Sequence, residues 1–419
     1  MPVRRMPFPR EIVLPLRQHA GKPAVPLVER GDRVERGDKV AAADGYMSVP
    51  MHASAAGVVT GIDWCPHPDG SMVEAVHIAV ERHSAQLPRP RMVPEWESLE
   101  GDEVARAVQE AGVVGLGGAA FPAHVKMAPP KDTKVETLIL NGAECEPYLT
   151  TDHRVMVEYP ERVHFGARIM MRALGVERAV IGVEANKPDA VAALRATIPT
   201  DLDITVESLT VKYPQGAEKM LIHAVTGREV PSGKLPVHVG AVVQNVGTIA
   251  AIAEVFETGL PLIERIVTVT GRGVNRPSNL IVPVGTRLRD VLDFCGGINE
   301  RAAEIVFGGP MMGMVQADLD TPLTKGTTGI VVLTHEETAQ RETLPCIRCG
   351  RCVDACPVFL MPQQLGALAQ LGRYDEMQEW NLADCMLCGS CSYVCPSGIP
   401  LSQMFALSKS ALRRKPKVA

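Results

Sequence analysis

The sequence predicts a multidomain protein of the α/β plus β class, and three observations along the chain support this. Short apolar runs separated by Gly and Asp turns fill residues 24–80. Strand and helix patterns alternate over residues 95–334, as in α/β domains. Two cysteine-rich runs, joined by a helical pattern, follow near the C-terminus. For 419 residues we expect two to four domains, since a domain usually has about 100–200 residues.

The composition excludes several classes of protein. Hydrophobic residues make up 46% of the chain, charged residues 22%, and the net charge is -5, so nucleic-acid binding is not indicated. Residues 1–16 carry Arg4, Arg5 and Arg10, but prolines interrupt every apolar stretch there, so this segment lacks the core of a signal peptide. No later segment has 18 uninterrupted apolar residues. We therefore expect a soluble, cytoplasmic protein that reaches a membrane only through partners.

The first segment, residues 1–86, is expected to form a small β sandwich preceded by an N-terminal arm. The similar pieces 29–34 and 35–40, followed by the stretch 53–59, resemble the barrel-sandwich fold of lipoyl and biotin carriers. Those carriers present a modifiable lysine at a hairpin tip, where this chain has Ala43-Asp-Gly-Tyr-Met-Ser-Val. We therefore predict a docking module and no swinging arm.

An α/β domain is predicted over residues 95–260, after a proline-rich linker at 87–94. Four apolar runs suit the strands of a sheet covered on both faces, and they lie at 134–140, 178–183, 203–209 and 239–246. Helical patterns lie between them at 160–174, 187–196 and 216–226. A second, smaller α/β unit is predicted over residues 261–334, and a charged linker follows at 335–344.

Two segments of the α/β domain indicate a ligand site. Residues 112–126 are rich in glycine, which lets backbone N–H groups approach a phosphate closely. A helical pattern precedes this segment, which excludes the Rossmann fingerprint, and composition alone fits a flexible turn equally well. The polar loop Asn141-Gly-Ala-Glu-Cys-Glu-Pro147 follows a predicted strand. Ligands of α/β sheets bind at such carboxyl ends, which favours the binding site over the turn.

The pattern C-x2-C-x2-C-x3-C-P occurs twice near the C-terminus and is typical of two [4Fe-4S] clusters. In two-cluster ferredoxins the fourth cysteine of each run ligates the other cluster. We therefore assign one cluster to Cys346, Cys349, Cys352 and Cys395, and the other to Cys385, Cys388, Cys391 and Cys356. Residues 340–408 are expected to form this domain, with a helical insert between the runs.

Zinc and disulfides are the alternatives for these cysteines. Paired C-x2-C spacings also suit zinc, but eight cysteines in two identical runs exceed the four ligands of one ion. A disulfide framework is disfavoured because the chain has no sign of secretion. The remaining cysteines, Cys65, Cys145 and Cys295, are expected to be small buried side chains. The chain is thus predicted to transfer single electrons.

Five segments resemble the NADH-binding flavoprotein subunit of respiratory complex I: the glycine-rich loop ending in Phe121-Pro122, the loop 141–147, and residues 213–218, 231–234 and 244–248. The resemblance implies FMN contacts from Gly115, Gly117, Gly118, Lys126, Asn141, Glu144, Tyr213, Asn245 and Thr248. It also implies that NADH is faced by Phe121, Glu146, Glu218 and Lys234, with Phe121 and Glu146 as catalytic residues. This chain departs from that family at Leu116, where arginine is usual, and at Ala143, where a carboxylate is usual.

Nearly the whole chain resembles the RnfC subunit of the Rnf electron-transport complex. The resemblance rests on GGAAFPAHVK, LNGAECEPYLTTDHR, FGGPMMG and both cysteine runs, and on the order of the four modules. It implies a β-grasp domain of the soluble-ligand-binding type (SLBB) over 261–334. It further implies an NADH:ferredoxin-type oxidoreductase coupled to ion translocation, peripheral on the cytoplasmic face of the cell membrane. Its implied partners are membrane subunits and, through the complex, ferredoxin or flavodoxin.

This order of parts is chemically consistent, because nicotinamide delivers two electrons at once, each cluster accepts one, and a flavin separates the pair. Two alternatives stay open. One is a soluble flavin and iron–sulfur reductase similar to cobalamin reductase, in which the carrier-like module tends to lie at the other end of the chain. The other is an iron–sulfur wiring subunit with a vestigial flavin pocket, against which Lys126, Asn141 and Glu146 argue.

Overall fold

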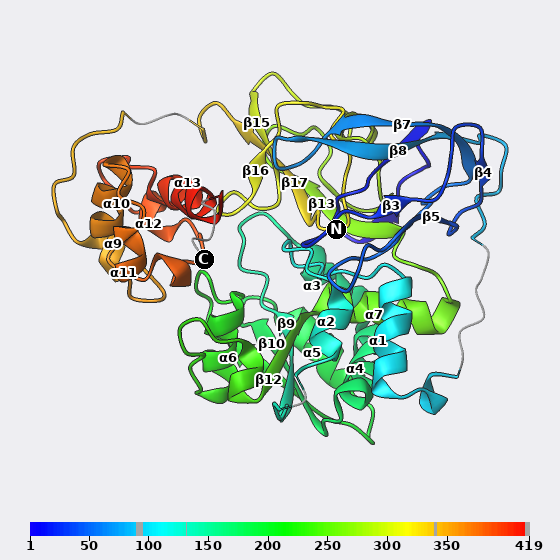
Figure 1. Cartoon of the computed structure of the whole chain (residues 1–419), viewed down its shortest axis with the longest axis horizontal. Coiled ribbons are helices and arrows are strands. Elements are labelled where there is room, and N and C mark those ends of the chain that lie inside the picture. The colour runs from blue at the N-terminus through cyan, green and yellow to red at the C-terminus, as the bar shows by residue number, and fades with distance from the viewer. Residues whose placement is uncertain (89–94, 131, 339–341, 415–419) are drawn as a thin grey trace.

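The computed structural model describes residues 1–88, 95–130, 132–338 and 342–414. Figure 1 shows an N-terminal β module beside a mixed sheet, an α/β domain below both, and a helical domain at the left. The linkers expected at 87–94 and 335–344 lie partly outside the described residues. Among the described residues, no helix is both long and apolar enough to cross a membrane.

The N-terminal module is a barrel sandwich, as predicted. One sheet has the strand order β2 (Glu11–Pro15), β8 (Met72–Val80), β7 (Gly57–Pro66) and β4 (Arg33–Val34). The second has the order β3 (Val25–Pro26), β5 (Lys39–Ala42) and β6 (Met51–His52). Its buried side chains, such as Ile12 and Val40, belong to the same hydrophobic core as those of the α/β domain. The module is therefore packed onto its neighbour over a continuous apolar interface.

The tip at which carrier domains present their lysine is fixed to the α/β domain. The Tyr46 ring meets the His124 ring edge-on, with centroids 5.3 Å apart, and His124 Nε2 lies 2.8 Å from the Tyr46 carbonyl oxygen. Gln109 Nε2 donates to the Ser48 carbonyl at 3.0 Å. The tip is therefore held against the α/β domain.

The α/β domain is built on a parallel sheet in the order β11 (Asp203–Leu209), β10 (Arg178–Glu184), β9 (Thr137–Gly142), β12 (Ala241–Asn245). On one face α4 (Pro160–Leu174) crosses α7 (Val246–Thr258), and α6 (Glu218–Thr226) covers the other (Figure 1). The crossing is close because Gly166 lacks a side chain: a Cβ there would lie 2.1 Å from the Ile249 carbonyl oxygen. The remaining elements are η1 (Trp96–Ser98), α1 (Gly101–Glu110), α2 (Ala123–Met127), α3 (Thr151–Glu158), α5 (Pro188–Ala196) and η2 (Pro236–Val239).

The third unit is a six-stranded mixed sheet with one packed helix, α8 (Leu288–Phe294). Its strand order is β1 (Val3–Arg5), β14 (Ser278–Pro283), β13 (Glu264–Thr270), β17 (Gly329–Thr334), β15 (Ala302–Phe307), β16 (Met314–Val315). The N-terminal strand β1 pairs in parallel with β14, so the arm that precedes the barrel sandwich completes the sheet of another unit.

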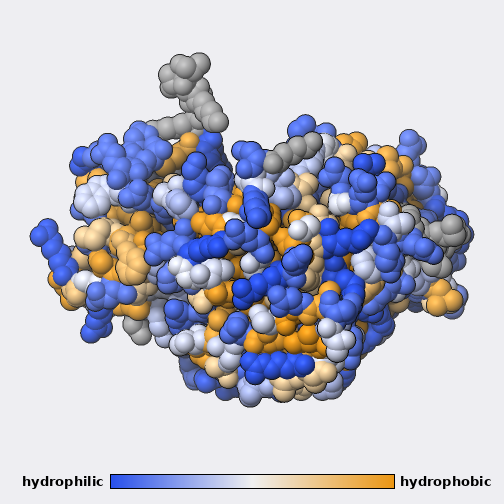
Figure 2. Space-filling view, turned by 90° about the horizontal axis from the view of Figure 1, so that it is seen from below, coloured by the Kyte–Doolittle hydropathy of each residue, from blue (hydrophilic) through white to orange (hydrophobic). Residues whose placement is uncertain are grey.

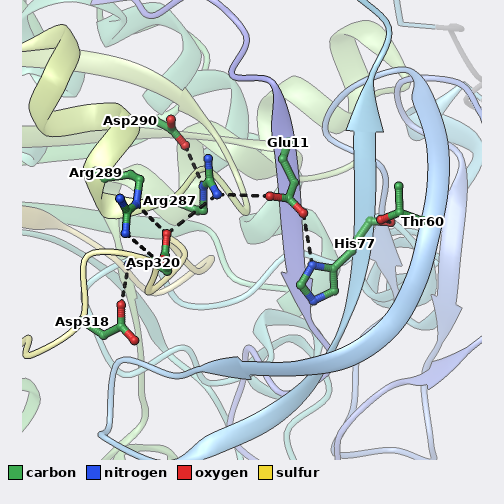
Figure 3. A network of polar contacts seen from close by, with 8 residues as sticks. All are labelled: Glu11, Thr60, His77, Arg287, Arg289, Asp290, Asp318 and Asp320. Carbon is green, nitrogen blue, oxygen red and sulfur yellow. Dashed lines mark hydrogen bonds and ion pairs between the residues drawn. The ribbon is translucent and has the colours of Figure 1, made fainter.

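A network of charged side chains joins this sheet unit to the barrel sandwich (Figure 3). Arg287 donates to Glu11 of β2 at 3.2 Å and to Asp290 at 3.0 Å, while Arg289 holds Asp320. His77 of β8 lies 3.4 Å from the same Glu11 carboxylate. The N-terminal module is thus attached to two neighbours, by apolar packing on one side and by ion pairs on the other.

The C-terminal domain is helical and has its own core around Leu365, Met377 and Phe405. Between the two cysteine runs lie α10 (Pro362–Gln370), α11 (Glu376–Glu379) and η3 (Leu382–Asp384), which confirms the helical insert. The other helices are α9 (Arg351–Asp354), α12 (Ser390–Tyr393) and α13 (Leu401–Arg414).

Candidate functional site

A cavity of about 600 Å³ opens at the carboxyl ends of β9, β10 and β11, the edge at which α/β sheets bind ligands. Three residues predicted from the sequence line it: Glu144, Glu146 and Tyr213. Its other lining side chains come from the ends of neighbouring strands and the loops after them: Cys145, Pro147, Tyr148, Leu149, Thr150, His153, Glu184, Asn186, Lys187, Asp189, Val211 and Lys212. The cavity is therefore rich in groups that can form hydrogen bonds.

The glycine-rich loop forms the second part of the site. The Leu116 amide donates to Thr248 Oγ1 at 2.8 Å, and Asn245 Oδ1 accepts the Thr248 amide as the N-cap of α7. The loop therefore lies at the N-terminus of a 13-residue helix, where N–H groups and the helix dipole attract anions. Gly118 has φ +102°, and open space surrounds the position of its absent Cβ. A phosphate group fits this arrangement.

Two half-buried carboxyl groups, those of Asp152 and Glu144, connect the loop with the cavity. Asn245 Nδ2 donates to Asp152 at 2.6 Å, and the amides of Asp152 and His153 donate to the Glu144 carboxylate at 3.0 and 3.1 Å. Burial, and then the neighbouring Asp152, raise the pKa of Glu144, and burial also raises the pKa of Asp152. Asn141 stands at the end of β9, where its Nδ2 donates to the Gly216 carbonyl at 2.8 Å. The two carboxyl groups, with their raised pKa values, can each hold a proton.

Lys126 is ion-paired in this structure. Its Nζ lies 2.5 Å from Glu218 Oε1 and 2.9 Å from the Val243 carbonyl oxygen. Two residues that the resemblance assigns to different ligands, Lys126 to FMN and Glu218 to NADH, are thus brought together. A phosphate held by Lys126 would have to exchange with the Glu218 carboxylate.

Glu146 is held by a turn of the sheet unit. Its carboxylate accepts the amides of Met311 and Met312 at 3.1 and 2.8 Å, and burial raises its pKa. Met311 and Met312 thus belong to a turn whose amides contact the candidate site. Cys65 and Cys295 are buried as expected, but Cys145 is half-buried and lines the cavity, so that expectation was wrong for Cys145.

The other predicted residues lie on connecting loops. Phe121 is half-buried in the glycine-rich segment, and its carbonyl accepts the Gly115 amide at 2.7 Å. Gly117 faces Asn245, whose side chain would lie 3.5 Å from a Cβ at that glycine. Lys234 is exposed on the loop before η2, and it is not among the residues that line the cavity. Its role towards NADH stays a prediction.

The first cysteine set surrounds one cavity of about 70 Å³. Cys346, Cys349 and Cys352 of the first run line it together with Cys395 of the second, as the crossed assignment requires. The Arg348 amide lies 3.4 Å from Cys346 Sγ, a contact of the kind that tunes a cluster. In the described residues no three His, Cys, Asp or Glu side chains are close enough to hold a single metal ion.

The second cysteine set also draws on both runs. Burial, and then the neighbouring thiols of Cys385, Cys388 and Cys356, raise the pKa of Cys391 to about 12. Cys356, from the first run, therefore lies near Cys391 and Cys385 of the second. The Leu360 amide lies 3.3 Å from Cys356 Sγ. The donors present in both sets fit [4Fe-4S] clusters.

The second run is in direct contact with the cavity region of the α/β domain. The Tyr213 hydroxyl donates to the Cys388 carbonyl at 2.7 Å. Asp384, which precedes Cys385, pairs with Lys219 at 3.2 Å and accepts from the Ser232 hydroxyl. The Met311 carbonyl is close enough to Gly389 that a Cβ there would approach it to 2.8 Å. Tyr213, assigned to FMN from sequence, thus joins the cavity wall to the second cysteine set.

Several site residues were missed in the sequence. Glu184 ends β10, Lys187 follows it, and the two form an ion pair at 3.0 Å. The rule that identified the loop after β9 would also have found them. Arg265 had no sequence signal, because it comes from β13 of the sheet unit. It is buried and donates to the Leu116 carbonyl at 3.1 Å, and its Nε has no hydrogen-bond partner among the described residues.

Family models match four successive segments of the chain. They are the RnfC barrel sandwich hybrid domain over residues 1–83, the Nuo51 FMN-binding domain over 108–254, the SLBB domain over 266–315 and the 4Fe-4S dicluster domain over 342–399. Together with the two cysteine sets, these matches define an electron-transfer subunit of the FMN and iron–sulfur class.

Curated relatives share most of the chain. One component of the proton-translocating ferredoxin:NAD(+) oxidoreductase complex of Clostridium ljungdahlii is 45% identical over 91% of this chain and 84% of the relative. Its counterpart in the Na(+)-translocating complex of Acetobacterium woodii is 44% identical over 90% and 85%. The counterpart in the ion-translocating oxidoreductase complex of Rhodobacter capsulatus is 42% identical over 99% and 80%. With the match to the RnfC barrel sandwich, these relatives show that the chain belongs to the RnfC family.

Among solved structures, the NAD+-reducing [NiFe]-hydrogenase in its H2-reduced state has a similar fold. The TM-score is 0.52 at 22% identity, over 77% of this chain and 62% of that chain. The air-oxidised state gives a TM-score of 0.52 at 20% identity, over 78% and 69%. At such identity the likeness concerns the fold alone.

Proposed function

We propose that this chain is the electron-input subunit of a membrane-bound NADH:ferredoxin-type oxidoreductase coupled to ion translocation. The contact between Tyr213 and Cys388 supports this most directly, because it joins the wall of the candidate nucleotide cavity to one cysteine set. We infer four domains: the barrel sandwich at 1–86, the α/β domain at 95–260, the SLBB-type domain at 261–334 and the cluster domain at 340–408.

The residues of the α/β domain would bind and orient the two nucleotides. The glycine-rich loop and the N-terminus of α7 would hold the FMN phosphate, with Lys126 available once Glu218 releases it. Asn141 and Asn245 would bond the polar edge of the flavin, and Phe121 offers an aromatic face for a flat ring. Glu146 would face NADH from a position fixed by the amides of Met311 and Met312.

Bound FMN would accept a hydride and release its two electrons singly. Around it, the half-buried carboxyl groups of Glu144 and Asp152 would hold the proton that accompanies this chemistry, since desolvation favours their neutral forms. The set Cys385, Cys388, Cys391 and Cys356 would hold the cluster nearer to the cavity. The set Cys346, Cys349, Cys352 and Cys395 would hold the distal one.

The relatives are subunits of ion-translocating complexes, which supports a place among further subunits for this chain. We infer that it is a translocase subunit on the cytoplasmic face of the membrane, attached through membrane subunits of an Rnf-type complex. Ferredoxin or flavodoxin would exchange electrons with it through the complex. The N-terminal position of the barrel sandwich argues against a soluble reductase similar to cobalamin reductase.

The proposal is tested by purifying the chain without oxygen and recording its visible spectrum before and after NADH, with iron, sulfide and FMN analysis. We expect about eight irons, as two [4Fe-4S] clusters require, one FMN, and bleaching by NADH. Full iron content without flavin or any response to NADH would overturn the proposal and leave the wiring subunit.

A further inference from the structure

The two cysteine runs have the same pattern but opposite surroundings. Every residue from 342 to 349 is exposed, and Ile347, between the first two cysteines, is 69% exposed. Residues 384–388 of the second run, which correspond to 345–349 of the first, are all buried or half-buried. The backbone is alike in both, since Arg348 and Leu387 hold φ values of 54° and 58° at matching positions. The difference therefore comes from what covers each loop.

The second loop is covered from within the chain. Tyr213 of the α/β domain donates to the Cys388 carbonyl, and Asp384 accepts from Lys219 and Ser232 of the same domain. The Met311 carbonyl lies close to Gly389. By the path proposed above, electrons enter the cluster domain on this side. Electron tunnelling slows steeply with distance, so the opposite cluster is useful only if another redox centre comes close to it.

The first loop carries the chemistry of a docking surface. Ile347 and Leu344, 69% and 50% exposed, give it an apolar centre. Arg348 and Arg351 are exposed where the covered loop has Leu387 and Ser390, and no described ion pair involves either arginine. Figure 2 shows the cluster domain at the left, with hydrophobic residues in orange among hydrophilic ones on the face seen. Apolar side chains with arginine are enriched in protein interfaces.

We propose that residues 342–351 dock a second protein that carries a one-electron redox centre and has an acidic surface facing Arg348 and Arg351. This inference rests on the proposed function. The loop of the second run supports a protein partner for the first. It is covered by the α/β domain, which forms hydrogen bonds to the Cys388 carbonyl and to Asp384, the residue before the first cysteine of that run. Arg348 and Arg351 have no charged equivalents in the second run, and they favour a partner whose facing surface is negatively charged.

The test measures binding of an acidic two-cluster ferredoxin, used as a probe, to the anaerobic holoprotein by titration calorimetry at low and high salt. We expect binding that weakens with salt and that Arg348→Glu and Arg351→Glu each weaken by about three- to tenfold. Arg178→Glu is the matched control, because Arg178 is exposed where β10 begins, at the sheet end opposite the cavity. Ile347→Ser should weaken binding without changing its salt dependence.

Three outcomes would overturn the proposal. The first is that no binding is detected, or that the charge reversals change it no more than Arg178→Glu does. The second is that the protein alone sediments as a dimer that Arg348→Glu dissociates, which would make the loop a contact between two copies. The third is that only vesicles of phosphatidylserine and phosphatidylcholine bind through these arginines. Iron content and cluster spectra confirm that each variant is intact, and bleaching by NADH, measured separately, tests the proposed function itself.

Discussion

Asp384 of the cluster domain contacts Lys219 and Ser232 of the α/β domain, and the contribution of these contacts to docking can be estimated and tested. Asp384→Ala removes the ion pair with Lys219 and the hydrogen bond from Ser232. The ion-paired side chains are 31% and 17% exposed, so the pair is worth about 0.5 kcal/mol, in the range of exposed pairs. A hydrogen bond to a carboxylate adds about 1.5 kcal/mol. The loss of about 2 kcal/mol would shift the docked-to-undocked equilibrium by roughly 30-fold.

Hydrogen exchange measures this equilibrium directly. Amides of residues 384–390 are covered by the α/β domain, so their exchange should accelerate by roughly 10- to 30-fold in Asp384→Ala, if opening and closing are fast. Amides in the core helix α13 should be unaffected. Glu379→Ala is the matched control, since Glu379 is an exposed acid of the same domain, on α11. Unchanged exchange at 384–390, with iron content intact, would refute the claim that the contacts of Asp384 hold the cluster domain against the α/β domain.

Three further predictions concern the clusters, the Glu144 carboxyl group and the core. Cys349→Ala should lose about four irons, one cluster, and abolish downstream electron transfer, while NADH still reduces the flavin; iron analysis and visible spectra check this. The pKa of Glu144 is raised from 4.5 to about 7, so its contribution to stability is complete below pH 4.5 and is lost as pH rises through about 7. Denaturation at several pH values should therefore show that the free energy of unfolding depends less on pH in Glu144→Gln. Lys325 is buried and donates to the carbonyls of Pro50 and Gly112 at 2.9 and 2.7 Å, so Lys325→Met should lower the free energy of unfolding by about 2–4 kcal/mol, against almost no change for the exposed Lys134→Met.

Local patterns in the sequence were enough to predict most of the fold. The run at 203–209 is β11 at the same limits, and the helix expected at 160–174 is α4. The cysteine spacing led to the assignment of Cys395 to the first set, and Cys395 lines one cavity with the three cysteines of the first run. Periodicity and spacing carry such information, since both describe residues that are near in the chain.

Contacts between distant residues left no such signal. Glu146 meets the amides of Met311 and Met312, which lie 165 and 166 positions away, and neither the turn nor its target shows a periodic pattern. The pairing of β1 with β14 left no signal for the same reason, since β1 precedes the barrel sandwich in the chain and β14 follows the α/β domain. The exposure of Cys145 depends on where β9 ends relative to its neighbours, which composition does not determine.

The central claim is that electrons from NADH reach the second cysteine set before the first. Rapid-freeze EPR of two anaerobic variants tests it most directly, with dithionite reduction as the measure of total cluster content. We predict that Cys349→Ala, which keeps the set of Cys385, Cys388, Cys391 and Cys356, still shows a cluster reduced by NADH as fast as in the unmodified protein. In Cys391→Ala the remaining cluster should be reduced by dithionite but only slowly by NADH. Rapid reduction by NADH in Cys391→Ala, with slow reduction in Cys349→Ala, would contradict the account.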